Sequence, residues 1–410
     1  MALDRLIPAE DALDIVLKDV EPVGIEQVSL LESAGKILSQ DLPAKRTQPP
    51  FDASAMDGYA VRQVDLANFP ASLRVIGQSR AGVPFNQKLS RNEAVRIFTG
   101  AVVPDGADTI IIQENTEAND DAVIVFSGNT TGKFIRKAGL DFNTGDILLT
   151  SGQSLLPNQI ALAAAMNYDR LPVYKQPKVA LLATGDELVK PGEDLHPGQI
   201  IASNTYGLHA ALQNHGGSVN NLGIIGDTRE ALAQALKRSI DQGADLIITT
   251  GGASVGDHDL VLPVAQEMGF KFEISKIAMR PGKPFLFGKF STGEKTVYLT
   301  GLAGNPVSSL VAYMVFVRPL LQRLSGQPAG ALNRVRAMLG CDLAENDERA
   351  EYMRAQLSHS DDGSLVATPF LKQDSSMLAN MVKADCLVYR PVLAQAAIKG
   401  DPCEIVFINH

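Results

Sequence analysis

Residues 245–259, DLIITTGGASVGDHD, pass from an apolar segment into a glycine-rich loop that ends in two acids. Its short apolar start is typical of a buried parallel strand. The glycines that follow allow a sharp turn and let backbone N–H groups approach a ligand. Asp257 and Asp259 add carboxylates at the end of the loop. This order favours a site for a phosphate-bearing ligand with Mg²⁺, although glycine-rich turns also occur in α/β folds without a ligand.

A basic turn follows, in which Lys276, Arg280 and Lys283 lie within the run KIAMRPGKP. Two prolines bracket a glycine there, so the turn is rigid and its side chains leave in fixed directions. Basic residues at a strand end also protect sheet edges, which is the plainer interpretation of this cluster alone. We predict that Lys283, held between Gly282 and Pro284, anchors an anion.

A third cluster, GLAGNPVSS at residues 301–309, follows a strand-like segment and opens an apolar helix from Val307 to Leu321. Pro306 suits the first helical turn and Asn305 suits the N-cap beside it. A helix N-terminus also attracts anions. Asn305 and Ser308 are therefore candidate ligand-binding residues.

These three clusters, in this order, resemble the molybdopterin molybdenumtransferase family, which includes the MoeA and gephyrin E-domain proteins. Further signatures of that family match DASAMDGYA at 52–60, IFTGA at 97–101, PDGAD at 104–108 and ATGDEL at 183–188. A nine-residue match is far more specific than a lone glycine motif. The resemblance covers essentially the whole chain. Asp374 departs from the family pattern and places an extra negative charge beside Ser375.

The resemblance implies a set of site residues. Catalytic roles fall on Asp57, Thr99, Glu187, Asp227 and Asp257, of which Glu187, Asp227 and Asp257 would hold Mg²⁺. Ligand-binding roles fall on Thr250, Gly251, Gly252, Ser254, Lys276, Arg280, Lys283, Asn305, Ser308, Arg354 and Ser375. Each acid also has a plainer interpretation: Asp227 is expected to cap a helix, and Glu187 suits a solvated loop.

The family activity implied for the chain takes adenylylated molybdopterin and molybdate, inserts molybdenum into the dithiolene and releases AMP. Asp57 and Thr99 belong to a different domain, so the resemblance implies a homodimer in which one subunit closes the cleft of the other. Implied partners are an adenylyltransferase resembling MogA and molybdoenzymes that accept the cofactor. Two alternatives stay open: an adenylyltransferase acting one step earlier, and a non-catalytic scaffold resembling gephyrin.

Composition indicates a multidomain globular chain in the cytoplasm. The 410 residues are 45% hydrophobic and 20% charged, with a net charge of −9 that argues against nucleic-acid binding. No apolar run approaches the roughly 20 residues that a membrane span needs. The early acids argue against a signal peptide. The three cysteines lie far apart, which disfavours a zinc site or a disulfide framework.

The element pattern predicts a multidomain α/β plus β fold. Residues 1–48 and 137–176 form an interrupted helical linker domain around a β-rich inserted domain at 49–136. Residues 177–326 alternate strands with helices, which predicts a doubly wound, mostly parallel sheet resembling MogA, with its ligand at the carboxyl ends of the strands. Residues 327–410 form a small C-terminal β-domain, in which no further helix is expected.

Overall fold

The computed structural model describes residues 5–128, 131–252, 259–293 and 295–408. Ser254 and Asp257, two of the predicted site residues, lie outside these ranges. The chain divides into two compact units, one made of Met1–Glu26 with Val173–His410 and the other of Gln27–Pro172. The division of the chain into four domains stays a prediction.

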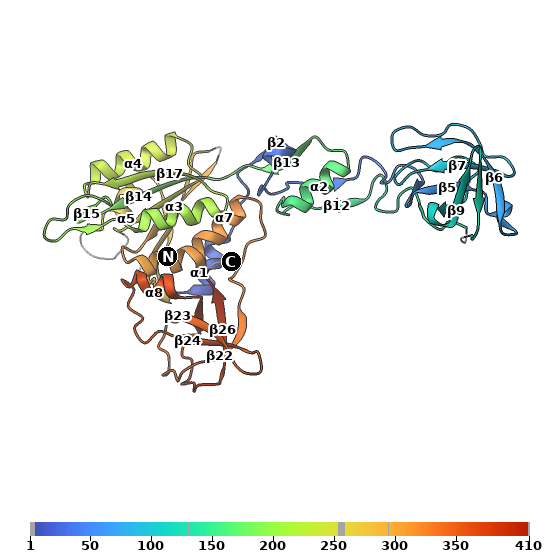
Figure 1. Cartoon of the computed structure of the whole chain (residues 1–410). Helices are drawn as coiled ribbons and strands as arrows, with labels where there is room; N and C mark the ends of the chain where they lie inside the picture. Colours follow the sequence, from blue (N-terminus) through green and yellow to red (C-terminus); the bar gives the residue numbers. More distant parts are fainter. Residues whose placement is uncertain (1–4, 129–130, 253–258, 294, 409–410) are drawn as a thin grey trace. The chain divides into compact units, whose positions relative to one another are not determined.

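The first unit contains the predicted α/β sheet (Figure 1). Strands β17 (Ser218–Ile225), β14 (Lys178–Thr184), β18 (Leu246–Thr250) and β21 (Thr296–Leu302) are parallel neighbours in this order. Strands β20 (Pro284–Ser291) and β19 (Lys271–Arg280) extend the sheet antiparallel, and β1 (Ile7–Pro8) pairs with β19. The sequence missed β20 because its start coincides with the proline-rich basic turn.

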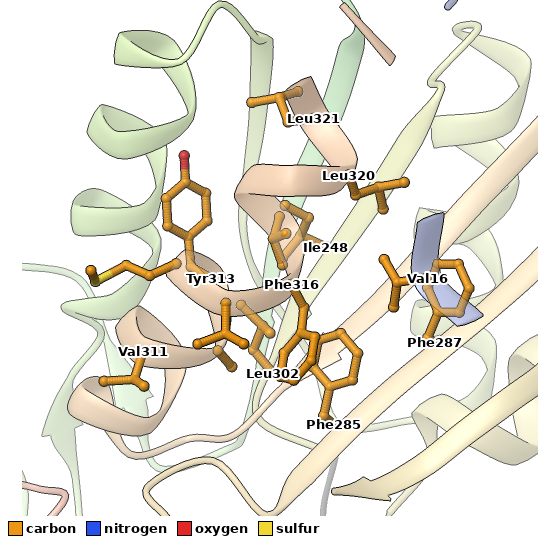
Figure 2. Close-up of a cluster of buried hydrophobic side chains, with 14 of the residues drawn as sticks. Val16, Ile248, Phe285, Phe287, Leu302, Val311, Tyr313, Phe316, Leu320 and Leu321 are labelled. Atoms are coloured by element: carbon orange, nitrogen blue, oxygen red, sulfur yellow. The ribbon is translucent and has the colours of Figure 1, made fainter. Parts of the chain in front are cut away.

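Helices cover both faces of the sheet, because neighbouring residues of a buried strand point to opposite sides. On one face Ile248 packs in a core with helices α1 (Ala9–Leu17), α3 (Asn204–Asn214), α6 (Pro306–Ala312) and α7 (Arg318–Leu324). Figure 2 shows Ile248, Phe285 and Phe316 in this core, and the two phenylalanine rings lie 4.8 Å apart. On the other face Ile247 packs with α4 (Arg229–Asp241) and α5 (Val261–Glu267). The doubly wound fold is confirmed.

The predicted helix after Asn305 is continuous but irregular. One π-helical turn, Tyr313–Val317, joins α6 to α7. A small parallel pair, β15 (Leu188–Val189) and β16 (Ile200–Ile201), lies in the long connection between β14 and α3.

The C-terminal strands close into a small barrel. Their order is β23 (Ala350–His359), β24 (Leu365–Pro369), β22 (Val335–Leu339), β26 (Pro402–Phe407) and β25 (Cys386–Arg390), and β25 pairs back with β23. Strand β23 also pairs with β19, which joins the barrel to the α/β sheet. A short helix, α8 (Leu378–Lys383), corrects the expectation that no helix follows residue 328. Its six residues are too few for a periodic apolar pattern.

The second unit contains the predicted β-rich insertion as a six-stranded sheet. Its order is β8 (Thr109–Ile112), β5 (Gly58–Val61), β7 (Glu93–Ile97), β6 (Ala71–Ser79), β10 (Ala122–Val125) and β9 (Thr116–Asn119). Helix α2 (Pro157–Ala165) is present as predicted. Short ladders in this unit pair β3 (Leu42–Pro43) with β12 (Ile147–Leu149) and β4 (Ala53–Ser54) with β11 (Ile135–Arg136).

None of the helices in the described ranges combines the length and the apolar character that crossing a bilayer requires. The cytoplasmic location stays a prediction.

Candidate active site

An open cavity of about 560 Å³ lies at the carboxyl ends of the parallel strands, where ligands bind in doubly wound folds. Its wall is built from the segments that follow β14, β17, β18 and β21. The predicted site residues that line this cavity are Glu187, Asp227, Thr250, Gly251, Gly252 and Asn305.

The glycine loop that forms one wall needs glycine for steric reasons. Gly251 has φ +80° and Gly252 has φ +59°, which is backbone that other residues rarely adopt. A Cβ on Gly251 would lie 2.3 Å from the carbonyl oxygen of Thr184, which no real side chain could do. The loop therefore turns sharply against the end of β14, as the sequence predicts.

Acidic groups dominate the cavity. Glu187, Asp227 and Asp259 line it, and no lysine or arginine does so within the described part of the chain. Burial raises the pKa of Asp259 to about 7, the amide of Val261 lowers it through a 3.2 Å hydrogen bond, and the nearby charge of Asp227 raises it. Carboxyls with pKa values displaced in this way cluster at functional sites.

Asp259 lines the cavity but is not among the acids that the sequence predicts as site residues. The sequence favours Asp257 as the metal ligand, because Asp257 directly follows the glycines. Asp259 directly precedes Leu260, the N-cap residue of α5, and Val261, its first residue. The signal that favours Asp259 is this fixed position at the start of a helix. Its carboxylate is one of the oxygens nearest the space that a Cβ on Gly252 would occupy, at 3.6 Å.

The prediction that Asp227 caps α4 is wrong. Thr228 is the N-cap residue, and its hydroxyl accepts a 3.2 Å hydrogen bond from the amide of Ala231. The amide of Asp227 instead donates to the carboxylate of Asp186 at 3.2 Å. Because Thr228 satisfies the helix end, capping does not explain the acid at position 227.

The carboxylate oxygens that line the cavity are of the kind that suits Mg²⁺. Among the described residues, no group of three or more His, Cys, Asp or Glu side chains could hold a metal ion. Mg²⁺ typically takes one or two carboxylates and completes its octahedron with water and substrate phosphates. Asp227 and Asp259 match that requirement.

A second cluster lies at the N-terminus of α6, where a loop of the C-terminal barrel docks. The side-chain amide of Asn305 donates to the hydroxyl of Ser375 at 2.9 Å, and the amide of Val307 donates to the carbonyl oxygen of Ser375 at 3.1 Å. Asn305 occupies the N-cap position, as predicted, but its side chain makes no capping hydrogen bond. Ser308 lies in the first turn of α6 and is buried. Asn305 thus contacts both the acidic cavity and the barrel.

Arg354 is the charged residue buried beside this cluster, only 1% exposed. Its Nε donates to Gln373 at 3.3 Å and one terminal nitrogen donates to the carbonyl oxygen of Met377 at 3.2 Å. The other terminal nitrogen is buried and has no hydrogen-bond partner in the described structure. Burial lowers the pKa of Arg354, and the charge of Asp374 opposes that shift. A buried guanidinium with an unused donor suits an oxyanion.

The extra negative charge at Asp374 is held by its own loop. Its carboxylate accepts hydrogen bonds from the hydroxyl of Ser376 at 2.6 Å and from the amide of Ser376 at 2.8 Å. These two bonds are the main causes that lower the pKa of Asp374.

The basic turn does not line the acidic cavity. Arg280 pairs with Glu351 at 3.0 Å and with Asp347 at 3.4 Å, so its guanidinium ties β19 to the C-terminal barrel. Lys283 is exposed, and its carbonyl oxygen accepts a 2.9 Å hydrogen bond from the amide of Ile277. Lys276 lies on β19. Of this turn, only Pro284 reaches the cavity wall in the described structure.

Asp57 and Thr99 lie in the second unit and contact each other. The carboxylate of Asp57 accepts hydrogen bonds from the amide of Thr99 at 2.8 Å and from its hydroxyl at 2.9 Å. The amide bond and then the hydroxyl bond lower the pKa of Asp57, which keeps the carboxylate charged. Their role across a dimer stays a prediction.

Comparison with known proteins gives similar proteins of one family along the whole length of the chain. Three family models match it: the MoeA N-terminal region (domain I and II) at residues 7–167, a probable molybdopterin binding domain at 180–323, and the MoeA C-terminal region (domain IV) at 336–408. The molybdopterin molybdenumtransferase of Haemophilus influenzae is 36% identical over 95% of both chains. That of Bacillus subtilis is 32% identical over 98% of this chain and 94% of its own.

A solved structure supports the same assignment. The molybdopterin biosynthesis MoeA protein from Pyrococcus horikoshii superimposes with a TM-score of 0.86 at 30% identity, covering 99% of this chain and all of its own. With its relatives matched over nearly their full length, the chain belongs to the molybdopterin molybdenumtransferase family, the MoeA proteins.

Proposed function

We propose that this protein inserts molybdenum from molybdate into adenylylated molybdopterin and releases AMP, which completes the molybdenum cofactor. The observation that carries the proposal is the pairing of two unlike sites through Asn305. One is the acidic cavity, and the other is the cluster of Arg354 and Ser375 at the N-terminus of α6. The names of its relatives support the same activity.

The acidic cavity would bind the diphosphate of the substrate together with Mg²⁺. An anionic diphosphate beside Glu187, Asp227 and Asp259 is repelled unless a cation lies between them. Asp227 and Asp259 would hold the ion, and Glu187 would orient its water. Bound there, Mg²⁺ would neutralise the diphosphate and polarise the bond to be cleaved. The proposal also keeps Asp257 as a catalytic residue that holds Mg²⁺ and Ser254 as a ligand-binding residue.

The glycine loop would fix the diphosphate without contributing charge. The backbone N–H of Gly252 can approach phosphate closely because no Cβ intervenes, whereas the N–H of Gly251 donates to the carbonyl oxygen of Leu302 at 3.2 Å and fixes the loop against β21. Thr250 is buried at the end of β18, so it gives that loop a rigid base. Pre-positioned groups of this kind lower the entropy cost of reaching the reactive geometry.

Molybdate would bind at the second cluster. The unused donor of Arg354, the hydroxyl of Ser375 and the N-terminal turn of α6 with Ser308 offer donors to a tetrahedral dianion. Lys276 and Lys283 would add positive potential from the neighbouring turn, and Arg280, paired with Glu351 and Asp347, would hold that turn in place. In the reaction a water molecule attacks the phosphoanhydride, so AMP leaves and molybdopterin keeps its phosphate. Molybdenum bonds to both dithiolene sulfurs, and one oxygen of molybdate leaves as water with the two thiol protons.

We further propose that the active protein is a homodimer. Asp57 and Thr99 of one subunit would then reach the cleft of the other, as the family resemblance implies. An adenylyltransferase resembling MogA would supply the substrate, and molybdoenzymes would accept the product.

The two alternatives are an earlier-step adenylyltransferase and a non-catalytic scaffold. The family matches at residues 7–167 and 336–408 lie outside the molybdopterin binding domain and disfavour the first. The acidic cavity lined by Glu187, Asp227 and Asp259 at the carboxyl ends of the strands disfavours the second, because a scaffold has no use for such a site.

The test incubates the purified protein with adenylylated molybdopterin, molybdate and Mg²⁺. Wild type and an Asp361→Asn control, altered at an exposed acid, should release AMP. Asp259→Asn and Asp227→Asn should each lose at least about 100-fold in rate, as when a metal-bound transition state is disrupted. Equal rates for all four proteins would refute the proposed site.

A further inference from the structure

An apolar lip, made by Leu188 and Ile200, forms part of the cavity wall in the connection between β14 and α3. In the β15–β16 pair, Leu188 lies beside Ile200. Paired residues in neighbouring strands point to the same face, so the two side chains lie next to each other, and both line the cavity. The amide of Ile200 donates to the carbonyl oxygen of Glu187 at 2.8 Å, and the amide of Ala202 donates to that of Val189 at 2.9 Å. These bonds hold the lip in one conformation.

Ile200 is unusually open to solvent for a residue in a cavity. The residue as a whole is 54% exposed. Leu195, in the same connection between β14 and α3, is also 54% exposed but does not line the cavity. The two residues therefore form a matched pair: equal exposure, similar size, and only one of them facing the cavity.

The lip and two of the three acids, Asp227 and Asp259, come from different parts of the sheet. Asp227 follows β17 and Asp259 follows β18, whereas the lip follows β14. The acids suit a cation, and the glycine loop suits a phosphate. Branched aliphatic side chains cannot pair with either, but they pack well against the flat face of an aromatic heterocycle.

We infer that Leu188 and Ile200 bind a flat heterocyclic ring of the substrate and thereby set which ligands the cavity accepts. This inference rests on the proposed function, whose substrate carries two such rings, an adenine and a pterin. The shared chemistry is the stacking of a planar ring on Ile200.

The contribution of the lip is measured with three probes and the purified protein. The probes are AMP, a soluble pterin, and inorganic pyrophosphate with Mg²⁺, which has no ring. Calorimetric titration gives the affinity of each for wild type, Ile200→Ala and Leu195→Ala. Thermal melting of all three proteins checks that the fold is unchanged.

Ile200→Ala should weaken binding of the ring-bearing ligand about tenfold. Each buried methylene typically contributes a factor of about four to the affinity, and the ring covers only part of the side chain. Pyrophosphate should bind as it does to wild type. Leu195→Ala should match wild type with every probe, and Ile200→Leu should recover most of the loss. Whichever of AMP or pterin responds identifies the ring.

Two results would overturn the inference. One is unchanged affinity of Ile200→Ala for both AMP and the pterin, and the other is an equal loss for pyrophosphate, which would place the effect on the phosphate end. Failure of the proposed function gives a different pattern. In that case wild type itself binds none of the three probes.

Discussion

Asp259→Asn should stabilise the metal-free protein and at the same time abolish its response to Mg²⁺. Burial raises the pKa of this carboxyl from 3.8 to about 7. A carboxyl whose pKa is higher in the folded than in the unfolded protein removes stability as the pH rises between those two values. The folded protein has lost all of this stability above pH 7 and none of it below pH 3.8. Asparagine keeps the shape and carries no charge at any pH.

The size of the effect follows from the interval between the two pKa values. At about 1.4 kcal/mol for each pH unit, the loss would reach about 4 kcal/mol. Solvent screening at this partly exposed carboxyl reduces the loss to about 2 kcal/mol. The variant should therefore melt about 5 °C above wild type at pH 8 and at the same temperature as wild type at pH 4.

Thermal melting at both pH values, with and without Mg²⁺, tests this prediction. Mg²⁺ should raise the melting temperature of wild type at pH 8 and leave that of Asp259→Asn unchanged, because ion binding stabilises only the protein that binds it. Asp361→Asn, at an exposed loop position, is the control for the loss of one negative charge. The reasoning fails if Asp259→Asn is no more stable than wild type at pH 8, or if its advantage is the same at pH 4.

Three further predictions concern the second cluster, the basic turn and the dimer. Arg354→Lys should weaken molybdate binding about tenfold in a calorimetric titration, since an ammonium group cannot reproduce the guanidinium fork; unchanged affinity would remove Arg354 from the site. Lys283→Ala should weaken molybdate binding by no more than about fivefold, because the side chain is exposed and screened, and a 100-fold loss would contradict that description. Sedimentation should give twice the mass of the chain, whereas a fully active monomer would leave Asp57 and Thr99 without a role.

The sequence predicts the architecture well because the elements carry local signals. Strand β18 is an apolar run that ends in glycines, and α6 begins at Asn305 and Pro306, as its capping residues indicate. Strand β20 was missed because Pro284, which normally indicates a turn, is its first residue. Helix α8 was missed because it is too short to show a period.

The site was less predictable because its contacts join distant segments. Asp227 has capping-box spacing to Glu230, but Thr228 next to it makes the capping bond, and one residue of register cannot be resolved from spacing alone. The sequence suggests a ligand-binding role for Arg280 because it shows no partner for the guanidinium. The actual partner, Glu351, is distant in the sequence and is brought near only by the pairing of β19 with β23. The burial of Asp259 depends on segments that are distant in the sequence, so no local pattern expresses it, and Asp257 lies outside the described residues.

The central claim is that this chain couples cleavage of the adenylate to the insertion of molybdenum. The most direct measurement follows AMP release and molybdenum bound to the dithiolene in the same reaction, with purified protein, adenylylated molybdopterin, molybdate and Mg²⁺. The account predicts one molybdenum inserted for each AMP released, and loss of both in Asp259→Asn. AMP release without molybdenum insertion, or no AMP from wild-type protein under these conditions, would contradict it.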